Sequence, residues 1–256
     1  MDQPQAIKRR RGVYLLPNLF TTASLFAGFY AIVAAINGRF ETAAVAIFVA
    51  TVLDGMDGRI ARLTHTQTDF GAQYDSLSDL ASFGLAPALV VYQWSLLNLG
   101  KLGWLAAFVY TAAAALRLAR FNTQAGIADK RFFQGLASPA AAGLVAGFVW
   151  VCEDHQLSVD GTVAGAAFLL TVTAALLMVS NARYHSFKGL DFKGRVRFVY
   201  ALMVVLGFVL ISSDPPLVLF GGLALYAASG PALTLVKLRQ RRAERRAQSS
   251  ADGGEQ

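Results

Sequence analysis

The sequence predicts an all-α integral membrane protein with about eight transmembrane helices, and composition and patterning both support this. Of the 256 residues, 55% are hydrophobic and 15% are charged, whereas soluble domains carry about 25% charged residues. The apolar residues gather in blocks near the ~20 residues that a helix needs to cross the ~30 Å hydrocarbon core of a bilayer. Short polar segments, in which basic residues cluster, separate these blocks.

The apolar blocks define the predicted elements in order along the chain. We expect membrane spans at residues 18–36, 40–62, 70–97, 101–121, 138–153, 161–182, 195–212 and 216–237. We interpret residues 13–237 as one transmembrane domain. A basic cytoplasmic N-terminus precedes it at residues 1–12. The tail at residues 238–256 is polar, small and charged, and is therefore predicted to be disordered.

Basic residues predict the orientation of these spans. One side of the membrane receives the basic segments at residues 8–11, 59–62, 117–131, 183–197 and 237–246, while the other receives only Arg39 and Lys101. The positive-inside rule therefore places both termini in the cytoplasm, as an even number of spans requires. We expect a multi-pass protein of the inner (cytoplasmic) membrane. The net charge of +7 indicates affinity for anionic membrane lipids and no nucleic acid, because no basic face belongs to a soluble domain.

The stretch "DGMDGRIARLTHTQTDFGAQYDSLSD" (residues 54–79) places acids at the predicted cytoplasmic ends of two spans. Asp54 and Asp57 are three residues apart and Asp75 and Asp79 are four apart, so each pair lies on one helix face. The turn between the spans would bring the two pairs together. Such carboxylates repel one another at low dielectric unless cations neutralise them. Clustered oxygen ligands suit Mg²⁺, Mn²⁺ or Ca²⁺. We call these four residues the carboxylate cluster.

Small residues interleave with the acids. They are Gly55, Gly58, Ala61, Gly71 and Ala72. Small side chains let membrane helices approach closely, and they leave room for a ligand beside the acids. Arg62 lies one turn beyond Gly58, and its guanidinium is suited to bind a phosphate through two parallel hydrogen bonds. Asp69, in the turn, is expected to cap the next helix.

The cluster carries a family resemblance. Its pattern D-x2-D-G-x2-A-R-x8-G-x3-D-x3-D resembles the signature of the CDP-alcohol phosphotransferases, which are membrane enzymes of phospholipid synthesis. The flanking segments are similar to those of the bacterial, membrane-integral phosphatidylserine synthases within that family. These segments are "PNLFTTASLFAG", "YDSLSDLASFGLAPA", "LRLARFNT" and "FQGLASPAAAG". The resemblance covers residues 12–145.

The resemblance implies a fold, a cofactor and site residues. The implied fold has six core helices around a polar cavity open to the cytoplasm, here with two added C-terminal helices, and it forms a homodimer. The four acids of the carboxylate cluster correspond to ligands of a divalent metal pair, Mg²⁺ or Mn²⁺, and Asp79 corresponds to the general base. Contacts with the CDP-lipid are implied for Asn18, Thr21, Gly58, Arg62 and Thr68.

The implied reaction transfers the phosphatidyl group of CDP-diacylglycerol to the hydroxyl of L-serine, which yields phosphatidylserine and CMP. The carboxylate of serine would suit an arginine, and Arg117 and Arg120 are candidates at i, i+3. An equally good interpretation is that both arginines extend to the membrane surface. Asn122 is a further candidate contact for serine.

Two alternatives stay open at this point. The same chemistry could use another acceptor, namely glycerol 3-phosphate, inositol phosphate or choline. A more distant alternative is an ion transporter that uses the acids as a transit site. Transporters often contain repeated halves with interrupted helices in matching positions, and no such repeat is evident in this sequence.

Overall fold

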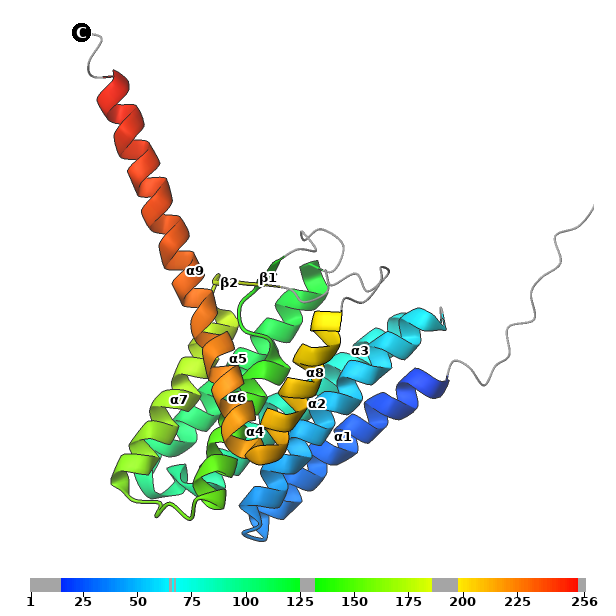
Figure 1. The fold of residues 1–256 in the computed structure, drawn as a ribbon. Coiled ribbons are helices and arrows are strands. Elements are labelled where there is room, and N and C mark those ends of the chain that lie inside the picture. The colour runs from blue at the N-terminus through cyan, green and yellow to red at the C-terminus, as the bar shows by residue number, and fades with distance from the viewer. Residues whose placement is uncertain (1–14, 65, 67, 125–131, 186–197, 253–256) are drawn as a thin grey trace, which may run out of the picture.

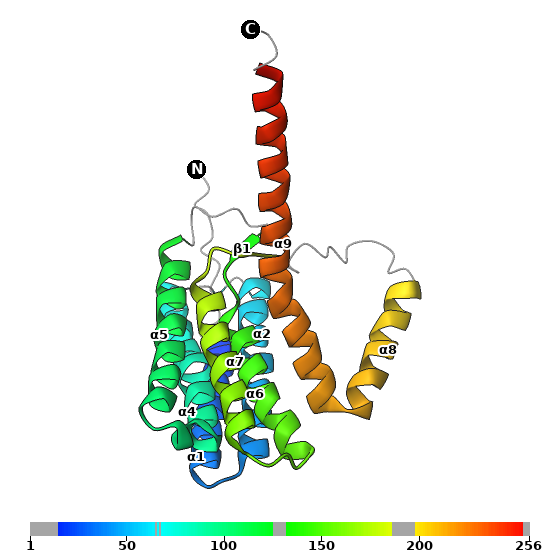
Figure 2. The same cartoon turned by 90° about the vertical axis from the view of Figure 1, so that its left-hand side faces the viewer.

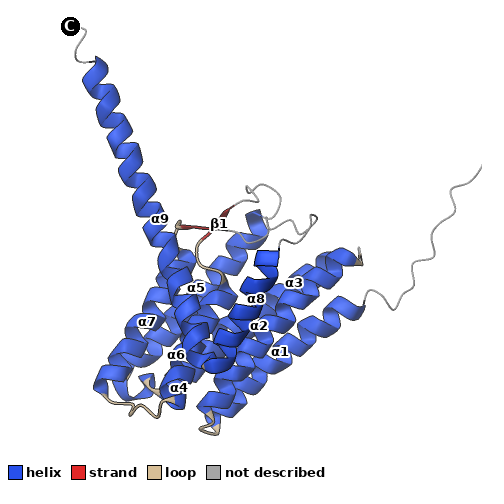
Figure 3. Cartoon of the chain, in the orientation of Figure 1, coloured by secondary structure: helices blue, strands red, loops and turns tan. Residues whose placement is uncertain are grey.

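The computed structural model describes residues 15–64, 66, 68–124, 132–185 and 198–252. The predicted basic N-terminus at residues 1–12, the first three residues of the predicted span 195–212 and the end of the tail at 253–256 lie outside the described residues. The described residues form a helical bundle (Figures 1 and 3) with one small antiparallel ladder. In this ladder, strand β1 (Phe132–Gln134) pairs with strand β2 (Arg183–His185).

Every predicted span has a helical counterpart, with bounds that differ by a few residues except at the third span and the last. The α-helices are α1 (Leu15–Ile36), α2 (Phe40–Leu63), α3 (Asp69–Asp79), α4 (Ala86–Trp94), α5 (Lys101–Gln124), α6 (Ser138–Asp154), α7 (Gly161–Val179), α8 (Phe198–Ser213) and α9 (Pro215–Asp252). The third predicted span is divided, because the π-helical segment Leu80–Leu85 joins α3 to α4 and a 3-10 turn, Leu96–Leu99, follows α4.

Four described helices are long and apolar enough to cross a membrane by length and composition. They are α1, α5, α7 and the first 20 residues of α9. Helix α2 is long enough but carries the charges of the carboxylate cluster, and α6 and α8 have 17 and 16 described residues. Four apolar helices of this kind indicate a membrane protein.

Proline explains why the third span changes its helical geometry. Pro87 lies in the first turn of α4 and has no backbone N–H to donate to the carbonyl of Phe83, four residues earlier. The buried hydroxyl of Tyr110 on α5 donates to that carbonyl instead, at 3.2 Å. The backbone N–H of Ala86 bonds to the carbonyl of Ala81, five residues earlier, as in a π-helix. The π-helical segment begins directly after Asp79. Such segments occur frequently at functional sites.

Serine side chains hold α1 against α3 and the π-helical segment. Ser78 and Ser82 each donate a hydrogen bond of 3.1 Å to a carbonyl of α1, that of Thr21 and that of Ser24 respectively. At Gly28 an added Cβ would lie 2.5 Å from the Ser82 hydroxyl oxygen. Small residues thus allow close backbone approach at this contact. The contact fixes α1 beside the carboxylate cluster.

The C-terminal helix extends further than the sequence analysis predicted. Helix α9 continues to Asp252 and projects beyond the bundle (Figure 1), so residues 238–252 are helical where disorder was expected. The stretch "KLRQRRAERRAQ" is rich in Arg, Ala, Glu and Gln, which have high helix propensity and can prolong a helix that is already formed. Helix α8 packs on α9 and stands away from the rest of the bundle (Figure 2). Its Leu202, Val205 and Phe208 are exposed, as expected of a surface that faces lipid.

Candidate active site

The structure brings the acids of the carboxylate cluster together at one end of the bundle. Asp54 and Asp57 come from α2 and Asp75 comes from α3, and each offers an oxygen within 4.8 Å of the others. Asp79, the last residue of α3, is within hydrogen-bonding range of Asp54. The helical spacings therefore predicted the real proximity of both pairs.

The donor set of the cluster fits a divalent cation. Asp57 is only 5% exposed, and Oδ1 of Asp75 is buried with no hydrogen-bond partner in the described structure. Several carboxylates this close to one another repel strongly unless a positive charge lies between them. Carboxylate oxygens are the ligands that Mg²⁺, Mn²⁺ and Ca²⁺ prefer. A cation among Asp54, Asp57 and Asp75 would give the buried Oδ1 of Asp75 a partner.

Helix α1 supports the cluster from one side. The hydroxyl of Thr21 is buried and donates a hydrogen bond of 2.7 Å to Oδ2 of Asp57. This bond orients the carboxylate, in the way that polar groups behind metal ligands commonly do. Thr21 was predicted to contact the CDP-lipid, and it also lines the pocket described next.

A pocket of about 460 Å³ opens beside the cluster. It is lined by all five residues for which a CDP-lipid contact was predicted, Asn18, Thr21, Gly58, Arg62 and Thr68, together with Asp57, Asp75 and Phe121 among others. A Cβ added at Gly58 would meet no atom within 4 Å, so the missing side chain leaves open space.

The start of α3, which borders this pocket, differs from the prediction. The N-cap is Thr68 and not Asp69, because the Thr68 hydroxyl accepts a hydrogen bond of 3.0 Å from the backbone N–H of Gly71. Asp69 is the first residue of the helix, where an acid still interacts favourably with the helix dipole. The shift of one residue leaves the Thr68 side chain tied to the helix end at the rim of the pocket.

Arg117 of α5 lies at the deep end of the cluster. Its Nη1 donates to the hydroxyl of Ser138, the first residue of α6, at 2.5 Å. The guanidinium is close enough to Asp79 for their charges to interact. Its Nε is buried and has no partner in the described structure. A buried donor left unpaired costs about 1–3 kcal/mol, so this nitrogen is suited to bind an acceptor group of a substrate.

The other two predicted serine contacts, Arg120 and Asn122, form hydrogen bonds with other partners than Arg117 does. Arg120 donates to the side-chain oxygen of Gln134 and, at 2.7 Å, to that of Asn181. Asn122 donates to the hydroxyl of Ser76 on α3 at 2.9 Å. The contribution of Asn181 was missed, because it follows α7, 61 residues after Arg120, and no local pattern marks it. It reaches Arg120 only because β1 and β2 pair.

The fold and site together define a class: a helical membrane protein with a cluster of carboxylates, suited to a divalent cation, beside a pocket lined in part by Arg62. Residues 14–180 match the CDP-alcohol phosphatidyltransferase family, and the chain belongs to this family of enzymes. The resemblance stated from the sequence is therefore confirmed. The match ends before β2, α8 and α9.

Curated relatives carry a more specific name. The chain is 36% identical over 213 residues, 83% of its length and 89% of the relative's, to a protein of Helicobacter pylori (strain 26695) named CDP-diacylglycerol–serine O-phosphatidyltransferase. A protein of Mycobacterium tuberculosis (strain H37Rv) with the same name is 42% identical over 141 residues, 52% of this chain and 49% of that relative. An archaetidylserine synthase of Methanothermobacter thermautotrophicus is 30% identical over 177 residues, 68% of this chain and 71% of that relative.

Proposed function

We propose that this protein transfers the phosphatidyl group of CDP-diacylglycerol to the hydroxyl of L-serine, with release of CMP. Family membership and the names of the relatives support the reaction class. The observation that carries the choice of acceptor is the name of the relatives, and Arg117, whose buried Nε has no partner in the described structure, lies near Asp79 and is suited to bind the carboxylate of serine. An amino-acid carboxylate would pair with that nitrogen and place the serine hydroxyl near Asp79.

The pocket beside the cluster is the binding site for the nucleotide end of the donor. Its lining combines Arg62, Asn18 and the open space at Gly58, which suits a diphosphate and a base. Asp54, Asp57 and Asp75 would hold a divalent cation, or two, which would supply positive charge for the diphosphate and the leaving CMP. The acyl chains of the donor enter from the surrounding lipid.

Asp79 is the general base of the proposal. A hydroxyl is a weak nucleophile at neutral pH, and a carboxylate within hydrogen-bond reach can take its proton during attack. The serine oxygen then bonds to the lipid-linked phosphorus while the bond to the CMP oxygen breaks. Asp79 lies directly before the π-helical segment, and we expect the backbone of that segment to fix the position of the base.

The remaining predictions complete the proposal. Eight helices cross the inner membrane, both termini are cytoplasmic, the carboxylate cluster faces the cytoplasm, and the protein is a homodimer. The turns between α1 and α2, α4 and α5, α6 and α7, and α8 and α9 lie together at the end of the bundle away from the cluster (Figure 1), as alternate crossing requires.

The test is an assay with purified protein in detergent or vesicles. With CDP-diacylglycerol, Mn²⁺ or Mg²⁺ and labelled serine, we expect CMP release and label in phosphatidylserine. Glycerol 3-phosphate, inositol phosphate and choline replace serine in parallel reactions. CMP release with one of these and not with serine would overturn the acceptor assignment. Ion flux in vesicles without any CMP release would overturn the reaction itself.

Variants of the two arginines locate the serine site. We expect Arg117→Lys to raise the KM for serine with little change in the KM for CDP-diacylglycerol, because lysine keeps the charge but loses the planar guanidinium. Arg120→Lys tests the second candidate. If neither variant changes the KM for serine, the serine carboxylate binds elsewhere.

A further inference from the structure

Arg117 and Arg120, one turn apart on α5, hold the two ends of the same short segment, residues 134–138. Nη1 of Arg117 donates to the hydroxyl of Ser138, the last residue of the segment. Nη2 of Arg120 donates to the side-chain oxygen of Gln134, its first residue. We propose that Arg120 is a positioning residue, which fixes this segment and, through Ser138, the guanidinium of Arg117, and does not itself bind serine. This inference rests on the proposed role of Arg117 in binding the carboxylate of serine.

The guanidinium of Arg120 has two amide partners. Besides Gln134 on β1, Nη2 donates at 2.7 Å to the side-chain oxygen of Asn181, which follows α7. One nitrogen of Arg120 therefore joins the start of the segment to the chain that leaves α7. This guanidinium is committed to two acceptors of the protein itself, whereas Nε of Arg117 has no partner in the described structure. The hydrogen bonds thus favour different roles for the two arginines.

The backbone holds the middle of the segment on the same support. The N–H of Gly135 donates to the carbonyl of Ala182 at 2.9 Å. The N–H of Leu136, a fully buried residue, donates to the carbonyl of Leu177 at 3.0 Å. Gly135 has a φ of +80°, and an added Cβ would overlap the carbonyl oxygen of Met178, so glycine lets the segment lie directly against the end of α7. The segment cannot shift relative to α7 without breaking these bonds.

Strand β2 is anchored in turn to α9. Pro231 in α9 has no backbone N–H to donate to the carbonyl of Ala227, four residues earlier. The hydroxyl of Tyr184 on β2, a fully buried residue, donates to that carbonyl at 2.9 Å. Because Asn181 lies just before β2, this bond helps to fix the amide that accepts from Arg120.

Ser138 connects this support to the proposed acceptor side of the site. It is fully buried and begins α6, so its hydroxyl has little freedom once the segment is fixed. That hydroxyl accepts from Nη1 of Arg117, which restricts the rotamer of a long side chain and therefore the direction of Nε. Pre-organising a binding group lowers the cost of binding a ligand. Loss of the bonds to Arg120 should therefore weaken serine binding without removing any group that touches serine.

The test changes Asn181, because replacing Arg120 itself would weaken serine binding in either role. Asn181→Leu in the full-length protein keeps the approximate size of the side chain and removes the acceptor. We expect the KM for serine to rise about tenfold, the change that follows from losing one hydrogen bond to a charged group. The KM for CDP-diacylglycerol and kcat at saturating serine should change little.

Asn181→Asp distinguishes positioning from direct binding. Aspartate has nearly the size of asparagine and keeps an oxygen that accepts from Arg120. If Arg120 is a positioning residue, this variant should recover most of the serine affinity that Asn181→Leu loses. If Arg120 bound the serine carboxylate, a second carboxylate beside it would compete, and a KM for serine above that of Asn181→Leu would overturn the inference. Measurement at about 0.15 M salt, where charges are screened over ~8 Å, limits the effect of the new charge at longer range.

A matched control and a second amide keep the comparison decisive. Asn37→Leu is the same change at the turn between α1 and α2, where the amide donates to the carbonyl of Val33, and it should leave the KM for serine unchanged. A parallel rise of both KM values in Asn181→Leu, with a lower thermal midpoint, would show a general loss of structure and reject the positioning role. Should Asn181→Leu fail to fold, Gln134→Met and Gln134→Glu repeat the comparison at the other amide.

The outcomes separate this inference from the proposed function. If Arg117→Lys raises the KM for serine and Asn181→Leu does not, Arg120 is not a positioning residue and the proposed function stands. If Arg117→Lys leaves the KM for serine unchanged, the proposed serine site fails and this inference fails with it. If serine supports no CMP release in the unmodified protein, the acceptor assignment is wrong, and the inference is rejected for that reason.

Discussion

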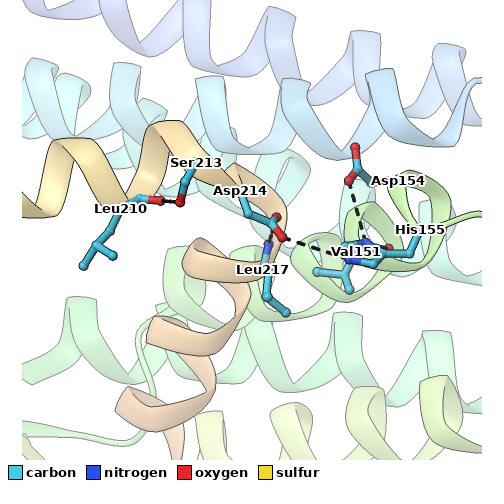
Figure 4. A network of polar contacts seen from close by, with 7 residues as sticks. All are labelled: Val151, Asp154, His155, Leu210, Ser213, Asp214 and Leu217. Carbon is cyan, nitrogen blue, oxygen red and sulfur yellow. Dashed lines mark hydrogen bonds and ion pairs between the residues drawn. The ribbon is translucent and has the colours of Figure 1, made fainter.

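The two ends of the bundle differ in whether their polar side chains have partners. At the end away from the carboxylate cluster, which we call the turn end, polar side chains have compensating partners. The indole N–H of Trp94 donates to Glu153 at 2.7 Å, and Asp160 caps α7. His155 lies between Asp154, at 3.6 Å, and Asp214, at 4.0 Å, while Asp214 also caps α9 (Figure 4).

At the cluster end, like charges meet and buried polar atoms are left unpaired. Asp54, Asp57 and Asp75 present oxygens to one another, while Oδ1 of Asp75 and Nε of Arg117 have no partner in the described structure. Native proteins pair most buried polar atoms, and each exception calls for an explanation. Both exceptions lie close to Asp79, and Asp75 also lines the pocket. The comparison supports a structural role for the polar groups at the turn end and a ligand-binding role for those at the cluster end.

The largest effect that would test this comparison is expected at Asp79. Asp79→Asn keeps the size of the side chain and removes the base, and should lower kcat by about 10²–10⁴-fold, the usual contribution of general base catalysis. Binding of CDP-diacylglycerol should be largely kept, as measured by equilibrium binding to vesicles that contain it. Glu153→Gln at the turn end is the matched control, with kcat expected to stay the same. Substantial remaining turnover in Asp79→Asn would remove Asp79 from the role of base.

Metal binding gives the second largest effect. Asp57→Asn removes one ligand charge from the cluster, and we expect binding of Mn²⁺ to the full-length protein to weaken by at least about tenfold, as is typical for groups that hold or support a metal ligand. Electron paramagnetic resonance of free Mn²⁺ measures this without any need for turnover. Chelation with EDTA should stop CMP release, and added Mn²⁺ should restore it. Equal Mn²⁺ affinity in Asp57→Asn and in Glu153→Gln would contradict a cation site at the cluster.

Thr21 should show a smaller effect, because it acts through Asp57. Thr21→Val keeps the shape of the side chain but loses the 2.7 Å bond to Oδ2 of Asp57. Outer-shell partners of metal ligands typically contribute about 10–100-fold to metal affinity or activity, and exposure of this pocket to water favours the lower end. Thr22→Val is the control, since Thr22 contacts Tyr74 and not an acid of the cluster. Identical Mn²⁺ titrations for the two valine variants would show that Thr21 does not support Asp57.

The sequence predicted the cluster well because the relevant geometry is local. Spacings of three and four residues place Asp54 with Asp57 and Asp75 with Asp79 on one face of each helix, and the short turn between the helices brings the two pairs together. The five CDP-lipid contacts were predicted from the family resemblance, and they line one pocket because α1 packs along α2. The helical elements likewise follow from apolar blocks of suitable length.

The parts that sequence reasoning missed depend on distant partners. From Pro87 and Pro231 the sequence predicts that the carbonyl four residues earlier in each helix lacks a backbone donor. Nothing local identifies Tyr110 and Tyr184 as the residues whose hydroxyls donate to these two carbonyls. Asn181 reaches Arg120 only through the pairing of β1 with β2. The surroundings of Arg117 and Arg120, the proposed acceptor side, were therefore less predictable than the carboxylate cluster and its pocket.

The smallest effect is expected at the turn end, and it tests the other half of the comparison. His155→Gln removes a side chain that is 44% exposed and lies near two exposed or half-exposed acids. Ion pairs of that kind contribute about 0–1 kcal/mol, so thermal unfolding in detergent should shift only slightly. The KM for serine and kcat should match those of the unmodified protein, because the change occurs at the end of the bundle away from the cluster. A several-fold loss of turnover in a variant that unfolds normally would show that the turn end communicates with the site, and the separation of roles between the two ends would no longer hold.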